Sequence, residues 1–134
     1  MNVFKLVEFF EKTNVEKLTE NKKISSSILL RRIVKPKLLY MSGEYTPVWF
    51  YIGVKDHVII PKTYCSCMDF IVNVMSRKTR LFCKHLLIQY ISEKTNNYRE
   101  VEINSVEELT RIINEIIDIN ISPTLRRLLF RRGD

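Results

Sequence analysis

The first segment of the chain places its hydrophobic residues with the period of a helix. Phe4, Val7 and Phe10 recur at intervals of three, with lysines and glutamates on the opposite side. A stripe of this kind predicts an amphipathic helix over residues 3–20. Its apolar side is more typical of a core face than of a surface that binds a partner.

The pattern then changes to one that is typical of strands. β-Branched and aromatic residues concentrate in four segments separated by turn residues, namely 24–34, 37–41, 48–54 and 58–63. Turns are expected at residues 42–44 and 55–56. We therefore predict an antiparallel β meander of three or four strands that leads directly into Cys65.

The second half of the chain returns to helical patterns. Residues 69–76 fit both periods, but we favour a short helix because Asp69 is a suitable N-cap and basic residues would follow in the last turn. Further helices are predicted over residues 82–94, after Ser105, and over residues 124–130. A glutamate stands three positions after Ser105 and completes a capping box.

Together these patterns predict an α+β protein of one domain, residues 1–134: an N-terminal helix, the meander, a cysteine-containing module with helices, and C-terminal helices. The composition, 46% hydrophobic and 28% charged, is that of an ordinary globular protein. The start of the chain lacks the basic-then-apolar order of a signal peptide, and no apolar run approaches a bilayer span. We expect an intracellular protein, cytoplasmic in a prokaryote or nuclear in a eukaryote, with no membrane partner.

All three cysteines and one of the two histidines form two short pairs, Cys65-Ser66-Cys67 and Cys83-Lys84-His85, with fifteen residues between them. Alternate residues of an extended segment point to one side, so the first pair offers both sulfurs to one ion. The second pair begins a predicted helix, whose dipole favours thiolate. Thiolate and imidazole are the ligands that Zn²⁺ prefers, and four of them close its tetrahedron. We predict one structural zinc ion with no open coordination position, and we therefore expect that the protein is not an enzyme.

One other interpretation of these four residues, as a redox site, is weaker. A redox dithiol of Cys65 and Cys67, with Cys83 as resolving thiol and His85 as base, would not need the additional Cys-x-His pair, whereas a tetrahedral site needs all four groups.

The other histidine, His57, falls in a predicted hairpin turn, where we expect a solvated side chain and not a ligand. The chain also lacks a glycine-rich phosphate loop, so ATP hydrolysis would have to come from a partner.

The net charge of +7 favours a polyanionic partner, with nucleic acid first. Between the two metal pairs lies a basic cluster, and its members are Arg77, Lys78, Arg80 and Lys84. We predict that these side chains share one face and contact backbone phosphates; an acidic protein partner is the alternative. The helix over residues 109–117 and the segment 126–132 are further candidates for docking a partner or DNA.

At this point the sequence resembles a known family. The pattern C-x-C followed by C-x-H defines the SWIM zinc finger, and Cys65, Cys67, Cys83 and His85 fill its ligand positions. The resemblance covers about residues 64–92. It extends to neighbouring positions, namely Phe70, Val74, Arg77, Lys78, Leu86, Leu87 and Tyr90, and is closest to the SWIM subunit of Shu-type recombination complexes. That family usually has a small residue where this chain has Ile88, so the packing there is expected to differ.

The resemblance carries a functional expectation. In that family the SWIM subunit pairs with a paralogue of the RecA/RadA-type recombinase, and the pair supports recombinase filaments on single-stranded DNA. By resemblance, we expect a zinc-stabilised accessory protein of homologous recombination and DNA repair, a binding module without catalysis. The alternative is a zinc-containing, DNA-binding transcriptional regulator without a recombinase partner.

Overall fold

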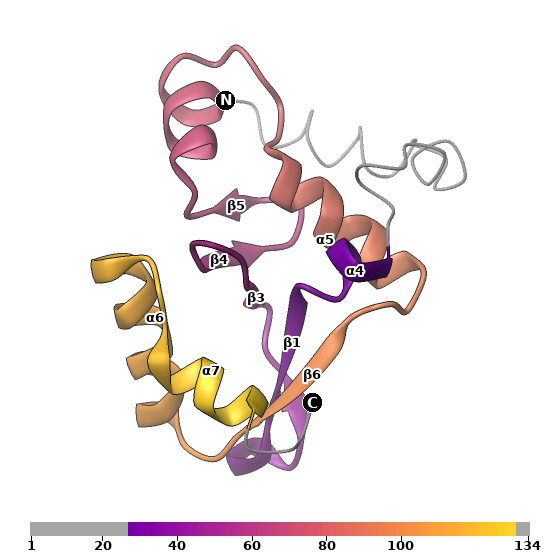
Figure 1. The fold of residues 1–134 in the computed structure, drawn as a ribbon, viewed down its shortest axis with the longest axis vertical. Coiled ribbons are helices and arrows are strands. Elements are labelled where there is room, and N and C mark those ends of the chain that lie inside the picture. The colour runs from indigo at the N-terminus through magenta and orange to yellow at the C-terminus, as the bar shows by residue number, and fades with distance from the viewer. Residues whose placement is uncertain (1–26, 131–134) are drawn as a thin grey trace.

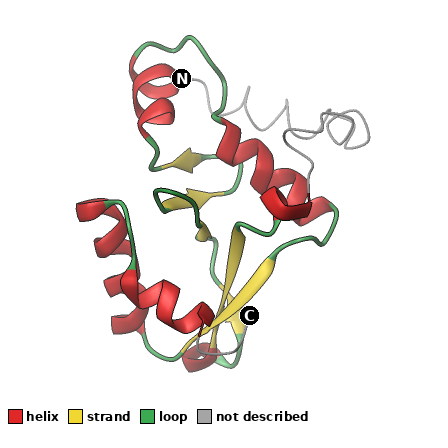
Figure 2. Ribbon diagram, viewed as in Figure 1, coloured by secondary structure: helices red, strands yellow, loops and turns green. Residues whose placement is uncertain are grey.

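The computed structural model describes residues 27–130. The predicted helix over residues 3–20 lies outside this range, as does the end of the 126–132 segment. Within the described residues, helices cover both faces of a central sheet, with α4 and α5 on one side and α6 and α7 on the other (Figures 1 and 2). No helix between residues 27 and 130 combines the length and the apolar character needed to cross a bilayer.

Between residues 27 and 130 the sheet has six strands: five follow the order β2-β1-β3-β4-β5, and β6 pairs with β1 outside this path. The strands are β1 (Ile33–Leu38), β2 (Glu44–Tyr45), β3 (Trp49–Tyr51), β4 (His57–Ile60), β5 (Tyr64–Cys65) and β6 (Arg99–Ile103). The first five strands pair antiparallel, as predicted. β6 instead pairs parallel to β1, with Val34 opposite Arg99 and Leu38 opposite Ile103.

Successive strand residues serve two different cores, as the pleat of a strand requires. Ile33 and Ile59 belong to the core beneath α4 and α5, whereas their neighbours Val34 and Val58 belong to the core beneath α6 and α7. The first core also contains the three cysteines. The prospective metal ligands therefore belong to one hydrophobic layer, on the face of the sheet opposite the C-terminal helices.

The helices follow the predicted positions closely in the second half of the chain. The metal-side face carries α4 (Ser27–Leu30), the seven-residue helix η2 (Phe70–Ser76) and α5 (Lys84–Lys94). The other face carries α6 (Val106–Ile119) and α7 (Pro123–Phe130). Ser105 caps α6 as predicted, because the Glu108 amide donates to Ser105 Oγ at 3.1 Å; the Glu108 carboxylate reaches one residue further back than in a capping box and accepts from the Asn104 amide at 2.9 Å. The α+β class is confirmed.

The sheet differs from the predicted meander in three places. Residues 27–30, inside a predicted strand, form α4, and residues 39–41, inside another, form the 3₁₀ turn η1 (Leu39–Met41). The third difference is the number of strands, six between residues 27 and 130 and not three or four, because β2 and β5 form outside the predicted segments and because residues 99–103 were not predicted to form β6. Its alternation of charged and buried residues was a usable signal, since Val101 and Ile103 are buried between the more exposed glutamates Glu100 and Glu102.

The turn between β3 and β4 lies where the sequence predicted it, but Asp56 within it is fully buried. Its carboxylate accepts hydrogen bonds from Arg126 Nη2 at 2.6 Å and Nε at 3.1 Å, and from the Ser122 amide at 3.0 Å. The hydrogen bonds that Arg126 donates to Asp56 raise the pKa of its guanidinium. Arg126, grouped by sequence with a docking segment, thus fixes α7 to the sheet.

Candidate metal centre

The four predicted ligands converge on one point at the metal-side face of the sheet. Cys65 ends β5, Cys67 follows two residues later, Cys83 is the N-cap of α5, and His85 lies in the first turn of α5. Their ligand atoms all lie within 4.8 Å of one another, and all four residues are buried. The approach of two distant chain segments was expected from the spacing and is confirmed.

The separations match those of a tetrahedral zinc site. His85 Nδ1 lies 3.8 Å from Cys65 Sγ and 4.0 Å from Cys83 Sγ. Zinc bonds of about 2.0–2.3 Å place tetrahedral ligands about 3.4–3.8 Å apart. These two nitrogen–sulfur distances are therefore a few tenths of an ångström longer than in the bound geometry, and Nδ1 is the ring nitrogen that faces the sulfurs. The residues present fit a closed Cys₃His site.

The backbone around the cluster favours thiolate at Cys67. The Phe70 amide donates to Cys67 Sγ at 3.3 Å. A hydrogen bond from the Cys65 thiol lowers the pKa of Cys67, and the same interaction raises the pKa of Cys65, because the first deprotonated sulfur is stabilised by its protonated neighbours. Hydrogen bonding to the charged form has this effect in general. A cation that replaces the shared protons would leave three thiolates around it.

Ser66, which the sequence pattern only placed between two ligands, holds the first pair in position. Its amide donates to the Val58 carbonyl at 3.0 Å, and its Oγ accepts from the Val58 amide at 2.9 Å. These two bonds continue the β4–β5 ladder, in which Ile59 lies opposite Cys65. Ser66 therefore fixes the backbone between the two sulfurs, a role visible only once β4 is placed beside it.

The prediction that the His57 side chain is solvated was wrong. It lies at the start of β4 and not in a solvated turn, and its side chain is buried. Its ring centroid is 4.4 Å from that of His85 and 5.9 Å from that of Tyr51. Burial, with a further contribution from His85, lowers the pKa of His57 to about 4. His57 is thus a neutral ring packed against a metal ligand, and the apolar strand that follows it was the overlooked sign of burial.

The segment between the metal pairs is helical, as favoured, but it is a π-helix. The Arg77 amide donates to the Val72 carbonyl at 2.8 Å, five residues back. Asp69 is not an N-cap: it is already helical and makes no capping bond. Its carboxylate instead accepts from Arg80 Nη1 at 2.8 Å and from Asn73 Nδ2 at 2.8 Å. These contacts close the loop that follows the helix.

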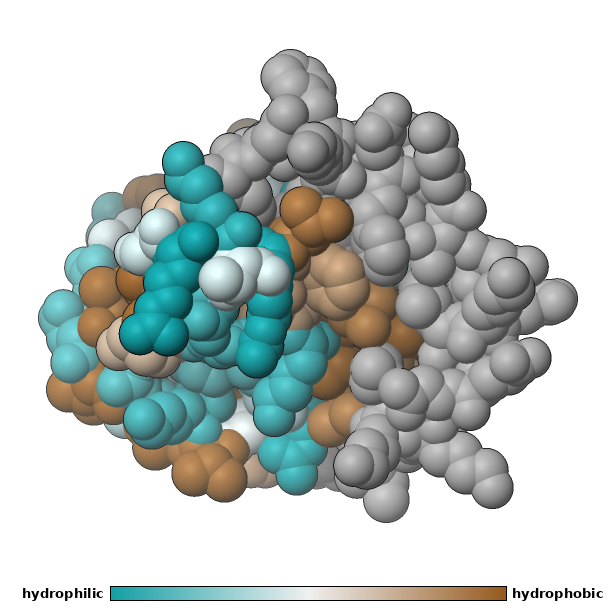
Figure 3. All heavy atoms as spheres, turned by 90° about the horizontal axis from the view of Figure 1, so that it is seen from above, coloured by the Kyte–Doolittle hydropathy of each residue, from teal (hydrophilic) through white to brown (hydrophobic). Residues whose placement is uncertain are grey.

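The four basic residues predicted to bind nucleic acid are all exposed. Arg80 is engaged by Asp69, whereas Arg77, Lys78 and Lys84 make no ion pair with any residue in the described part of the chain. Exposed hydrophobic side chains accompany them, namely Met68, Ile71, Met75 and Leu81. Seen from this end of the molecule, hydrophilic and hydrophobic groups lie side by side (Figure 3).

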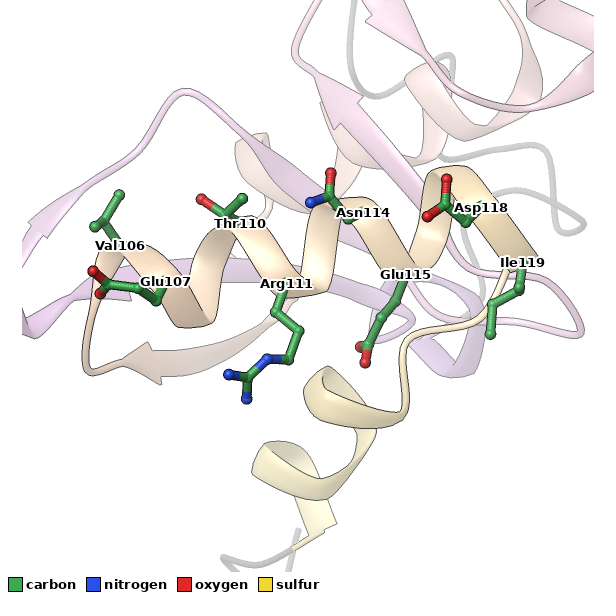
Figure 4. Close-up of a pocket in the computed structure, with 8 residues that line it drawn as sticks. All are labelled: Val106, Glu107, Thr110, Arg111, Asn114, Glu115, Asp118 and Ile119. Carbon is green, nitrogen blue, oxygen red and sulfur yellow. The ribbon is translucent and has the colours of Figure 1, made fainter.

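A separate hollow of about 550 Å³ runs along the outer side of α6 (Figure 4). Arg111 and Glu115 extend from it toward α7. Although partial burial acts to raise the pKa of Glu115, hydrogen bonds from Ser122 and Thr124 outweigh it and hold that pKa below its usual value. Glu115 thus caps α7, and neither cysteine nor histidine lines this hollow.

Comparison with known proteins points to the same module. The chain is 27% identical over 71 residues to the zinc finger SWIM domain-containing protein 7 homolog of Dictyostelium discoideum, an alignment that covers 49% of this chain and 46% of that relative. It is 35% identical over 52 residues to zinc finger SWIM domain-containing protein 7 of Mus musculus, covering 39% of this chain and 34% of that relative. These matches support membership of the SWIM zinc-finger family.

The matched part of the chain spans less than half of the length of either curated relative. No family model matches the chain, and no solved structure gives a significant match. The SWIM assignment therefore depends on these two relatives and on the ligand cluster, in which a Cys-x-Cys pair and a Cys-x-His pair meet.

Proposed function

We propose that this SWIM protein is a zinc-stabilised accessory protein of homologous recombination and DNA repair, akin to the SWIM subunit of Shu-type complexes. It binds a RecA/RadA-type recombinase paralogue and single-stranded DNA and does not itself catalyse a reaction. The observation that carries the proposal is the closed, buried cluster of Cys65, Cys67, Cys83 and His85 beside an exposed basic segment. The recombination role itself comes from the family resemblance.

The ligand set favours a structural ion over a catalytic one. Three sulfurs and one ring nitrogen fill all four positions of a tetrahedron, which leaves no site for a reactive water. When bound, zinc would supply cross-linking of β5 to α5, and apparent binding energies of about 10–16 kcal/mol for such sites become folding energy. The burial of all four ligands also argues against the redox dithiol, because a reactive thiolate needs solvent access.

The basic segment supplies the nucleic-acid surface of the proposal. Arg77, Lys78 and Lys84 are exposed and make no ion pair within residues 27–130, so they are available to phosphates without losing a partner. Arg80 would have to leave Asp69, and we expect it to contribute less than the other three. Each phosphate contact that is lost should reduce the salt slope of DNA binding by about one unit.

The recombinase paralogue would dock on the exposed hydrophobic residues beside the basic segment. Ile71 and Met75 on η2, and Met68 just before it, have exposed fractions of 37%, 49% and 71%. The helix α6 is a weaker docking candidate than its sequence pattern indicated, because Ile112 and Ile116 are buried in the core beneath it.

The proposal is tested by three measurements on the full chain. Copurification from the native cell should recover a RecA-like ATPase, and binding assays should favour single-stranded DNA over duplex. Strong preference for one duplex sequence without an ATPase partner would instead establish the alternative, a DNA-binding transcriptional regulator. Metal analysis of protein purified without chelator should find one zinc per chain; unliganded, reactive thiols would establish the redox alternative.

A further inference from the structure

A hollow of about 310 Å³ adjoins the metal centre and collects three cationic side chains. These are Arg32, Lys55 and Lys84, and no aspartate or glutamate between residues 27 and 130 lines the hollow. They come from three separate segments: Arg32 precedes β1, Lys55 lies in the β3–β4 turn, and Lys84 begins α5. The tertiary structure alone brings them together, so no sequence cluster predicted this site.

The three cations have no competing partner among the described residues. None of them forms an ion pair there, and Asp56, the nearest acid in sequence to Lys55, is committed to Arg126. Gly53 lets Arg32 and Tyr51 approach this turn closely, since a Cβ at that position would lie 3.4 Å from Arg32 Nη1 and 2.7 Å from Tyr51 Cε1. The arrangement concentrates positive charge without internal neutralisation.

The walls beneath the cations are aromatic and include a polar atom without a partner. The Tyr51 and His85 ring centroids are 4.5 Å apart, and His57 completes the group. His57 is only 8% exposed, and its Nδ1 has no hydrogen-bond partner among the described residues. A buried polar atom of this kind indicates a ligand or water that completes it.

We propose that this hollow binds a phosphate group of a nucleic-acid strand. The inference deepens the DNA-binding part of the proposed function and rests on it. Three cations give a charge of +3, and a zinc ion with three thiolates beside them gives −1, which leaves a net +2 for an anionic group. The first turn of α5 adds the positive end of a helix dipole.

The position of Lys84 explains why the phosphate belongs to a strand. Lys84 lines the hollow and also ends the basic segment that starts at Arg77. A strand that follows this segment would reach the hollow through Lys84, so the hollow anchors one phosphate and the segment contacts its neighbours. A volume of about 310 Å³ leaves ample room for one such group.

The test compares the zinc-loaded full chain with the variant Arg32→Gln/Lys55→Gln, which leaves the proposed 77–84 contacts unchanged. The matched control is Arg31→Gln/Lys94→Gln, which removes the same charge from exposed positions outside the hollow and outside every candidate docking segment, just after α4 and at the end of α5. Zinc content and thermal midpoint are measured for each protein. Fluorescence anisotropy then follows binding of a 12-nucleotide single strand with either a 5′-hydroxyl or a 5′-phosphate.

We expect the Arg32→Gln/Lys55→Gln variant to lose about tenfold in affinity, equivalent to about 1.4 kcal/mol, and the control to lose much less. Equal losses for both strands identify an internal phosphodiester; a loss confined to the phosphorylated strand identifies a terminal phosphate. Equal affinities of variant and control overturn the inference. Inorganic phosphate is titrated in parallel by amide NMR, and a response to it without any loss for either strand overturns the assignment to nucleic acid.

The proposed function and this inference fail differently. If wild-type protein binds strands through Arg77 and Lys78 but the Arg32→Gln/Lys55→Gln variant is unaffected, only the hollow is wrong. If wild-type protein binds no strand at all, the DNA-binding part of the proposed function fails and this inference fails with it.

Discussion

Truncation of Arg126 to alanine gives the most direct test of how α7 is joined to the sheet. Arg126 connects α7 to the β3–β4 turn through two hydrogen bonds to the fully buried Asp56 carboxylate and one to the Gly53 carbonyl at 2.8 Å. Its side chain is 29% exposed and that of Asp56 is 0% exposed. Among the described residues, the substitution would leave the buried carboxylate with only the Ser122 amide as a donor.

The expected cost follows from that burial. Removal of one partner of a buried ion pair destabilises a protein by about 3–5 kcal/mol. Because Arg126 is partly exposed and water can reach its place, we expect the lower end, about 3 kcal/mol. With a urea m-value of about 1.5 kcal/mol/M, the unfolding midpoint should fall by about 2 M.

The assay is equilibrium urea unfolding of zinc-loaded protein, followed by circular dichroism. Arg127→Ala is the matched control, because the neighbouring arginine is exposed and makes one long contact, 3.4 Å, to Thr124 Oγ1; it should cost less than about 0.5 kcal/mol. The double variant Asp56→Ala/Arg126→Ala should cost less than the sum of the single variants, since each single change strands the other group. An Arg126→Ala variant as stable as Arg127→Ala would refute the reasoning.

Three further predictions concern the metal centre and the C-terminal helices. Cys83→Ser, or a strong chelator, should abolish cooperative unfolding and the protection of the backbone amides of β5, η2 and α5 from hydrogen exchange. The reason is that metal binding contributes about 10–16 kcal/mol, which is as large as the whole stability of a domain, roughly 5–15 kcal/mol. Amide protection that survives complete zinc removal would contradict this prediction. Ser66→Ala should lower the free energy of unfolding by about 1–2 kcal/mol, since the Val58 amide loses its acceptor, whereas the exposed Ser76→Ala should be neutral; both are measured by urea unfolding. Glu115→Gln should destabilise the protein by up to about 1 kcal/mol at pH 7. Because folding lowers the pKa of Glu115, the carboxylate's contribution is complete above the usual carboxyl pKa of 4.5 and is lost as the pH falls through the lower folded value. The difference in stability between Glu115→Gln and wild type should therefore shrink below about pH 4.5, and a difference that is independent of pH would count against the hydrogen bonds.

The sequence by itself determined the features that depend on local pattern and on residue chemistry. The spacing of Cys65, Cys67, Cys83 and His85 predicted the ligand cluster. Few types of side chain bind zinc, so two short pairs of such residues indicate a shared metal site. Ser105 predicted the start of α6 for a similar reason, since capping involves residues only three apart. The alternating strands predicted an antiparallel sheet up to β5.

Only the tertiary structure decided which distant residues meet. Asp56 and Arg126 are 70 positions apart, and nothing local distinguishes a buried partner from a solvated charge. The same holds for His57, whose burial depends on α5 packing over β4, and for the parallel pairing of β6 with β1. The periodicity of hydrophobic residues predicts which face of a helix or strand is apolar, but it does not predict which other element packs on that face. Pairing across the sheet and between layers is fixed by packing of the whole chain.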